Sequence, residues 1–256
     1  GSNKPTQGPC SHSGSPQQRR QSLPIVFPMN YMPKNIKAVL FDMDGTLWDT
    51  EQVSERAIGQ LLEEWRIDST QVDLLTFHGI KWSIIGLLLE QQFPSLRGSE
   101  PAAAIEARFE ELQQVEPAPL IRGARQAFVA AAAALPHATA IVTGSDSHAV
   151  EAFLDLADLR SHCATYNSAD MYERSKPDPQ SYTMTAARLG VEPDHCLVFE
   201  DSLAGMQAAA AANMHCIAIT AGHAPRIAAG QEHADGVITD YTELPEGFFR
   251  QVSQAA

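Results

Sequence analysis

The sequence predicts an α/β protein in which a doubly wound, Rossmann-like parallel sheet carries an inserted all-helical cap. First, residues 38–41 form an uninterrupted apolar run that ends in acidic residues, as expected for a central strand covered by helices on both faces. Second, strand-like and helix-like segments alternate from residue 123 onward, which is the pattern of βαβ units. Third, residues 50–117 carry helical patterns without a strand signal, so this segment interrupts the sheet rather than extending it.

These patterns set the domain boundaries. Residues 34–49 and 118–256 are predicted to form the α/β core domain, and residues 50–117 the helical cap domain. Residues 1–33 are rich in serine, proline and glutamine and contain no acid, so we expect a disordered N-terminal extension or a segment added for expression. A transit peptide is the alternative for this segment, although its prolines oppose an amphipathic helix.

The cap segment begins with an amphipathic pattern. An apolar residue recurs at every fourth position from Val53 to Trp65, which predicts a helix with one apolar face, and Thr50 is placed to cap its N-terminus. Further helical patterns cover residues 84–92 and 102–114.

The core segment alternates between the two kinds of element. Helices are predicted over residues 123–135, 147–157, 179–189 and 203–212. Strands are predicted over residues 139–143, 162–166, 196–199 and 216–219, with a short one over 236–239. Asp42, Thr143 and Asp201 then fall at the carboxyl ends of strands, where open parallel sheets bind their ligands.

Composition narrows the class of partner. The 256 residues can bury a full core, and the net charge of −13 with a pI of 5.0 argues against a nucleic acid or an anionic membrane as partner. No apolar run is long enough to span a bilayer. We therefore expect a cytoplasmic protein that binds a small molecule, as a monomer or, alternatively, as a weak dimer.

The acids after the first strand predict a metal site. Because side chains alternate along an extended chain, Asp42 and Asp44 can project to one side, where two like charges are unfavourable unless a cation lies between them. Gly45 lets the backbone turn sharply and present amide hydrogens to an anion.

Four motifs occur in an order that resembles a known family. They are DMDGTLWDT after the first strand, IVTGS at residues 141–145, KPDP at residues 176–179 and FEDSLAG at residues 199–205. Together they resemble the signatures of the haloacid dehalogenase-like superfamily, in particular its β-phosphoglucomutase-like branch with a helical cap, which also contains sugar-phosphate phosphatases.

The resemblance implies a role for each motif residue. Asp42 would be the nucleophile that forms an aspartyl phosphate, and Asp44 the general acid and base. The implied phosphate-binding groups are Thr143, Gly144 and Lys176. The implied Mg²⁺ ligands are Asp42, Asp44 through its carbonyl, and Asp201, with Glu200 as a further ligand or a residue that supports the metal site.

The function that follows is a Mg²⁺-dependent phosphatase of a small phosphorylated metabolite, a sugar or polyol phosphate. A sugar phosphomutase is the first alternative, and Thr46 favours the phosphatase because mutases of this branch more often have valine after the glycine. A catalytically silent binding protein is the alternative of another class, and it would be expected to have lost an acid or the lysine.

Lys81 is the candidate for substrate specificity. It lies in a glycine-containing loop between two predicted cap helices, beside Trp82. Caps of the family use this loop to contact the part of the substrate that is not phosphate. The equally good alternative is that Lys81 is exposed to solvent and binds no substrate, because a single lysine in a loop is common.

Overall fold

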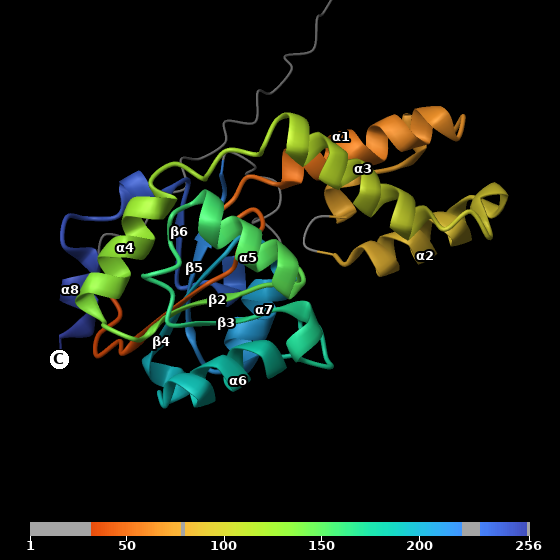
Figure 1. Cartoon of the computed structure of the whole chain (residues 1–256). Coiled ribbons are helices and arrows are strands. Elements are labelled where there is room, and N and C mark those ends of the chain that lie inside the picture. The colour runs from red at the N-terminus through yellow and green to blue at the C-terminus, as the bar shows by residue number, and fades with distance from the viewer. Residues whose placement is uncertain (1–31, 78–79, 222–230, 255–256) are drawn as a thin grey trace, which may run out of the picture.

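The fold is a six-stranded, all-parallel sheet with a helical insert (Figure 1). The computed structural model describes residues 32–77, 80–221 and 231–254. The strands are β1 (Ala38–Phe41), β2 (Thr139–Val142), β3 (Thr165–Asn167), β4 (Cys196–Glu200), β5 (His215–Ile219) and β6 (Gly236–Ile238). Their order in the sheet is β3-β2-β1-β4-β5-β6, the arrangement of a doubly wound dinucleotide-binding fold.

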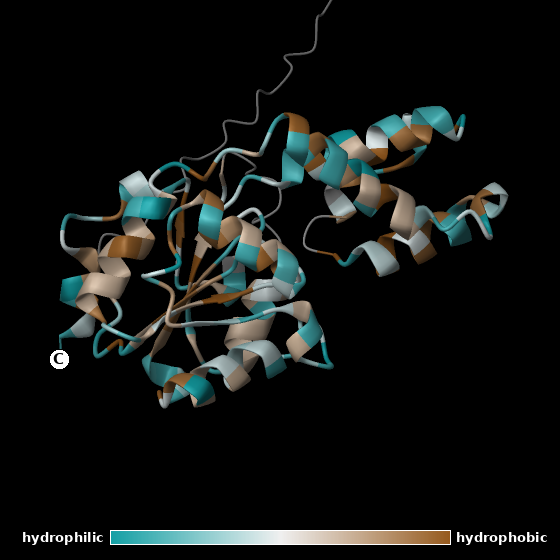
Figure 2. Cartoon of the chain, viewed as in Figure 1, coloured by the Kyte–Doolittle hydropathy of each residue, from teal (hydrophilic) through white to brown (hydrophobic). Residues whose placement is uncertain are grey.

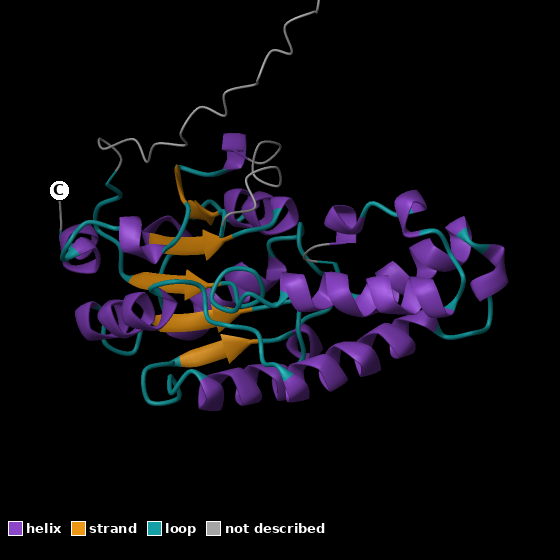
Figure 3. Cartoon of the chain, turned by 90° about the horizontal axis from the view of Figure 1, so that it is seen from above, coloured by secondary structure: helices purple, strands orange, loops and turns teal. Residues whose placement is uncertain are grey.

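Helices cover both faces of the sheet (Figure 3). One face packs against α4 (Ala124–Ala134), α5 (Ser147–Leu156) and α8 (Phe248–Ser253), and the other against α6 (Gln180–Leu189) and α7 (Leu203–Ala211). Alternate residues of β1 divide between the two apolar clusters: Val39 and Phe41 pack on the first side, Ala38 and Leu40 on the second. Burial on both faces is why the central strands β1 and β4 are mostly apolar in sequence, and brown marks the middle of the sheet in Figure 2.

The helical insert has an apolar cluster of its own. It contains α1 (Glu51–Glu64), α2 (Trp82–Gln92) and α3 (Pro101–Val115), which pack on one another beside the sheet (Figure 1). Its cluster is built from buried side chains such as Leu62, Leu89 and Ile105. The remaining short elements are 3-10 turns at Ser69–Gln71, Leu74–Phe77, Pro94–Leu96, Ala169–Met171, Pro193–His195, Gln231–His233 and Tyr241–Glu243.

The predicted fold class is confirmed, and most predicted elements agree with the structure within one or two residues. The prediction for residues 162–166 is wrong at its start, because the strand covers Thr165–Asn167. The amides of His162 and Cys163 both donate to the carbonyl of Leu159, so these residues belong to the turn that follows α5.

Two further expectations concern the termini and the membrane. The predicted N-terminal extension lies outside the described residues, except for Met32 and Pro33, which belong to no helix or strand. Within the described part of the chain, no helix has both the length and the apolar character needed to cross a bilayer.

Candidate active site

The candidate site lies where the strand order reverses, between β1 and β4. The two strands pair in parallel with Phe41 opposite Phe199, and the Asp42 amide donates to the Phe199 carbonyl over 3.0 Å. The residues that follow this pair, Asp42 on one strand and Glu200 and Asp201 on the other, therefore emerge at the same edge of the sheet. Ligands of doubly wound sheets bind at this reversal.

Lys176 joins two of the carboxylates. Its ammonium lies 2.6 Å from Asp42 Oδ1 and 2.6 Å from Glu200 Oε1, and it also donates to the Val142 carbonyl over 3.1 Å. Burial alone lowers the pKa of Lys176, but Asp42 and Glu200 outweigh that effect and raise it. Lys176 is therefore held as a buried cation.

Asp42 has the opposite balance. Burial, followed by the charge of Glu200, raises its pKa well above the ordinary value, and the charge of Lys176 opposes this rise only in part. A further cation near Asp42 would favour its ionised form.

Glu200 is fully buried and accepts hydrogen bonds on both oxygens. Oε1 accepts from Lys176 and, over 2.8 Å, from the Tyr182 hydroxyl. Oε2 accepts from the Ser202 hydroxyl and from the amides of Asp201 and Ser202. These bonds fix the carboxylate beside Lys176.

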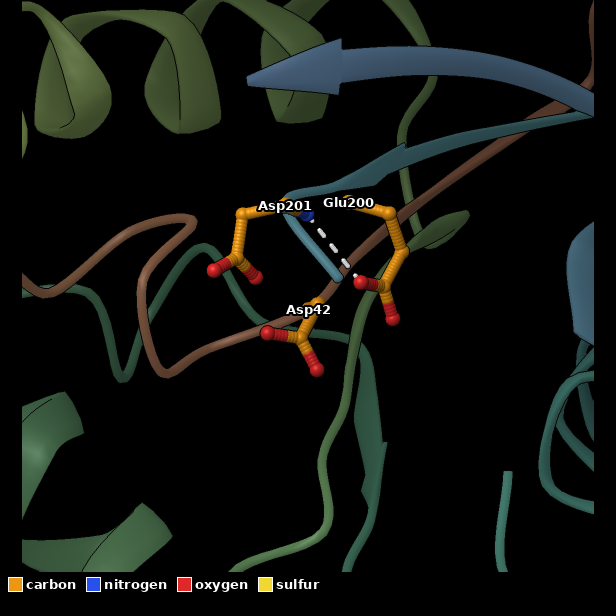
Figure 4. Close-up of side chains that lie close together, drawn as sticks. All are labelled: Asp42, Glu200 and Asp201. Carbon is orange, nitrogen blue, oxygen red and sulfur yellow. Dashed lines mark hydrogen bonds between the residues drawn. The ribbon is translucent and has the colours of Figure 1, made fainter. Parts of the chain in front are cut away.

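The carboxylates of Asp42, Glu200 and Asp201 form an acidic cluster (Figure 4). One oxygen from each lies within 4.8 Å of the others, and all three residues are buried. A set of oxygen donors, here carboxylates, suits Mg²⁺. The three ionised carboxylates and the Lys176 ammonium together carry a net formal charge of two negative charges, which a divalent cation would neutralise. The residues present therefore fit a magnesium ion.

Gly45 and Thr46 hold this cluster from the loop after β1. A Cβ on Gly45 would lie 2.1 Å from Asp201 Oδ2, and the φ of Gly45 is +75°, so only glycine fits this turn. The Thr46 hydroxyl donates to Asp201 Oδ1 over 3.1 Å. Thr46 is fully buried, and its hydroxyl therefore orients Asp201, a candidate metal ligand, from inside the protein.

Asp44 is separate from the acidic cluster. Its carboxylate accepts hydrogen bonds from the hydroxyls of Thr50 at 2.9 Å, Ser145 at 2.6 Å and Thr143 at 3.2 Å. Asp42 and Asp44 both line the same cavity, and Met43 between them packs with Val39 and Phe41 in the apolar cluster, so the alternation of β1 continues past its last residue. That their side chains share a cation stays a prediction.

Thr50 has a different partner from the one expected, and the phosphate-binding role of Thr143 stays a prediction. Thr50 occupies the N-cap position of α1 but makes no side-chain capping bond, because its backbone is helical at φ −76° and ψ −16°. The hydroxyl of Thr143, predicted to bind phosphate, donates to Asp44. Gly144, the residue after Thr143, is exposed.

The site opens into a cavity of about 1040 Å³ between the helical insert and the core. Asp42, Asp44, Lys176 and Asp201 line it on the core side. Lys81 lines it on the insert side, with its ammonium 5.3 Å from the centre of the Tyr172 ring. The structure thus brings the predicted residues Asp42, Lys176, Glu200 and Asp201 together, and Lys81 lines the same cavity from the insert.

Several residues of the site were not predicted to belong to it. Tyr182 and Ser202 hold Glu200, and Ser145 and Thr50 hold Asp44. Ser145 and Ser202 belong to the IVTGS and FEDSLAG motifs, which is a usable signal, whereas Tyr182 lies in helix α6, outside the motifs.

The sheet is doubly wound, and acids and a lysine meet where its strand order reverses, next to a helical insert. This is the arrangement of an α/β enzyme that binds its ligand at the carboxyl ends of the strands. Residues 36–213 match the family model described as haloacid dehalogenase-like hydrolase. The chain therefore belongs to the haloacid dehalogenase-like hydrolase family, as the motifs predicted.

Similar proteins agree with this assignment. The chain is 31% identical over 197 residues to the fructose-1-phosphate phosphatase YqaB of Escherichia coli, covering 73% of this chain and 97% of that protein. It is 33% identical over 218 residues to hexitol phosphatase B of Escherichia coli, covering 83% and 96%. The fold is similar to that of β-phosphoglucomutase from Clostridium difficile, with a TM-score of 0.65, 20% identity and coverage of 83% and 97%.

Proposed function

We propose that the protein is a Mg²⁺-dependent phosphatase that hydrolyses a sugar or polyol phosphate through an aspartyl phosphate on Asp42. The observation that carries this proposal is the position of Asp42 on the cavity wall, 2.6 Å from the buried Lys176 and within a cluster of three carboxylates. The substrate class follows from the relatives, whose names describe phosphatases of fructose 1-phosphate and hexitol phosphates.

In the first step, a carboxylate oxygen of Asp42 attacks the phosphorus atom, and the bond from phosphorus to the alcohol oxygen breaks. Asp44, which faces the cavity, gives its proton to that alcohol oxygen, so the alcohol leaves neutral. Lys176 offsets negative charge on the phosphoryl oxygens. Splitting hydrolysis into two displacements lowers the barrier of each.

In the second step, a water molecule attacks the phosphorus atom, and the bond from phosphorus to Asp42 breaks. Asp44 takes a proton from this water, which restores both carboxyl groups and releases inorganic phosphate. A Mg²⁺ ion held by Asp42, Asp201 and the Asp44 carbonyl, with Glu200 as a further candidate, would supply positive charge to the phosphoryl group.

Residues 50–117 serve in this proposal as a cap domain that covers the bound substrate. The insert supplies one wall of the cavity, including Lys81, Trp82 and Phe109. Lys81 would bind hydroxyl groups or charge on the substrate body, since it lines the cavity from the insert and its ammonium stands over the Tyr172 ring.

The charge of the cavity favours a phosphatase over a mutase. A mutase must bind a sugar bisphosphate, whose second phosphate lies beyond the catalytic centre. In this region the cavity carries Glu55, Glu106, Glu110 and Asp146, and Lys81 is its only lysine or arginine among the described lining residues besides Lys176. Burial, then the charges of Glu110 and Asp146, raise the pKa of Glu106, so an additional anion there would be unfavourable.

The experiment measures phosphate release from fructose 1-phosphate and from hexitol phosphates, with Mg²⁺ and with chelator. Stoichiometric phosphate release that requires Mg²⁺, without a sugar bisphosphate, is the expected result. Interconversion of sugar phosphates without phosphate release would instead establish the mutase. Binding without turnover of any phosphate ester would establish the silent binding protein, an alternative that the cluster of acids and its contact with Lys176 disfavour.

A further inference from the structure

The cavity is larger than a hexose or hexitol phosphate requires. Its volume of about 1040 Å³ lies just above the range of roughly 300–1000 Å³ that is usual for pockets that bind drug-sized molecules. It is continuous from Asp42 and Lys176 on the core to the helices of the insert. A substrate anchored by its phosphate at Asp42 therefore has room for a further group toward the insert.

The wall of the insert is aromatic where it meets this space. Trp82 of α2 and Phe109 of α3 both line the cavity, with ring centres 5.5 Å apart and planes inclined at 50°. Both rings are only partly buried. Tilted ring pairs of this kind offer an apolar surface that a third ring can join.

Exposed apolar side chains also line the cavity on both sides. Ile84 of α2 exposes 43% of its surface, and Leu156 of core helix α5 exposes 50%. Large apolar side chains gain about 25 cal/mol for each Å² that a ligand removes from water. A polyol, whose surface is mostly hydroxyl, would use little of this potential.

The carboxylates of the same cavity restrict the charge of such a ligand. Glu106 and Glu110 lie on α3 with Phe109, and Asp146 lies at the start of α5. An acidic group beside Phe109 would meet these charges, so the apolar group must itself be uncharged.

We propose that the enzyme also accepts, and prefers, phosphate esters of sugars that carry an uncharged apolar ring, such as aryl glycoside phosphates. This inference rests on the proposed phosphatase function. The phosphate binds at Asp42 and Lys176, and the ring binds between the Trp82–Phe109 pair and the side chains of Ile84 and Leu156.

The test compares two substrates that differ only in the added group, methyl glucoside 6-phosphate and phenyl glucoside 6-phosphate. The wild-type enzyme is expected to have a kcat/KM about tenfold higher for the phenyl compound, the usual scale of a well-packed apolar group. Ile84→Asn and Leu156→Asn should remove most of this preference while changing kcat/KM for the methyl compound by only about twofold to threefold. Both side chains are exposed, so neither variant should impair folding.

Leu87→Asn is the matched control, because Leu87 lies on the same helix as Ile84, is 58% exposed and does not line the cavity. This variant should keep the preference for the phenyl compound. Equal kcat/KM for both compounds in the wild type, or an equal loss for both in the Ile84 and Leu156 variants, would overturn the inference and leave the phosphatase proposal intact. Absence of phosphate release from these compounds and from the hexitol phosphates alike would refute the phosphatase proposal itself, and this inference with it.

Discussion

Lys176 donates to Asp42 over 2.6 Å, and the same ammonium donates to Glu200 over 2.6 Å. One buried cation thus stands against two carboxylates directly and a third, Asp201, in the same cluster. Removing one partner of a buried ion pair commonly lowers the stability of a protein, because the other charge is left buried and unpaired. Removing one of several buried like charges commonly raises the stability. Which residue is changed therefore decides the sign of the effect on stability.

Asp42→Asn should abolish turnover, because an amide is a poor nucleophile. Since burial and Glu200 raise the pKa of Asp42, the ionised carboxylate is costly in the folded protein, and the amide should not lower the melting temperature measured in chelator. Mg²⁺ should raise the melting temperature of the wild type, because a ligand of the folded state stabilises it, and raise that of the variant less. A variant with undiminished turnover or an unchanged response to Mg²⁺ would remove Asp42 from these roles.

Tyr182→Phe should lower the free energy of unfolding by about 1–3 kcal/mol, because it removes a buried donor to a charged carboxylate. The remaining donors to Glu200 keep the carboxylate near its position, so kcat/KM should fall by about tenfold at most. Tyr166→Phe is the control, since the Tyr166 hydroxyl also bonds a carboxylate, that of Glu151, away from the cavity. Chemical denaturation and steady-state kinetics of both variants measure the contrast, and loss of kcat/KM in Tyr166→Phe would make the effect nonspecific.

Gly205→Ala should be among the most damaging of conservative changes. A Cβ at Gly205 would lie 1.8 Å from Glu200 Oε1, so the glutamate that holds Lys176 would have to move. We expect turnover to fall by more than about a hundredfold and the free energy of unfolding to fall by about 1–3 kcal/mol from overpacking.

Gly59→Ala is the matched control for this change. Gly59 lies inside helix α1, and a Cβ there meets nothing within 4 Å. Alanine should raise the free energy of unfolding by about 0.5–1 kcal/mol, as glycine is the weaker helix former. Thermal denaturation with turnover assays distinguishes the two variants, and equal behaviour would mean that Glu200 tolerates displacement.

The sequence could predict that Asp42, Thr143 and Asp201 meet, because each follows an apolar run and the carboxyl ends of parallel strands meet at one edge. Lys176 follows no strand and was predicted only from the KPDP motif. The sequence could not locate the residues that orient them. Ser145 meets Asp44 across 101 positions and Tyr182 meets Glu200 across 18, and no local pattern encodes either contact.

One local rule agrees with the structure and another fails. Alternation predicted that Asp42 and Asp44 project to one side, and both line the cavity while Met43 packs in the core with Phe41. Capping preference assigned Thr50 to the helix, but a capping side chain needs an extended backbone at that position, and Thr50 is helical. Its hydroxyl is therefore available to Asp44.

Asp44→Asn should slow esters with poor leaving groups more than p-nitrophenyl phosphate, because a stable departing oxygen needs less help from an acid. Ser145→Ala should show the same selectivity at smaller magnitude, about threefold to tenfold in kcat for an alkyl phosphate, since it removes one of three hydroxyl donors to Asp44. Equal losses for alkyl and p-nitrophenyl esters would argue that Asp44 does not protonate the leaving oxygen.

Lys81→Ala tests how the insert contributes to specificity. The ammonium of Lys81 stands over the Tyr172 ring at 5.3 Å, and Lys81 lines the cavity from the insert. If Lys81 contacts the substrate body, removing it should lower kcat/KM for the sugar phosphate. The expected loss of transition-state stabilisation is about one to three kcal/mol. p-Nitrophenyl phosphate, which lacks the hydroxyl groups of a sugar, should be hydrolysed within about threefold of the wild-type rate. Arg97→Ala removes an exposed cation of the insert that does not line the cavity, so it should leave both substrates unaffected. Parallel kinetics of the two variants on both esters decide the matter: an equal effect of Lys81→Ala on the two esters, or none on either, would place Lys81 outside the specificity site.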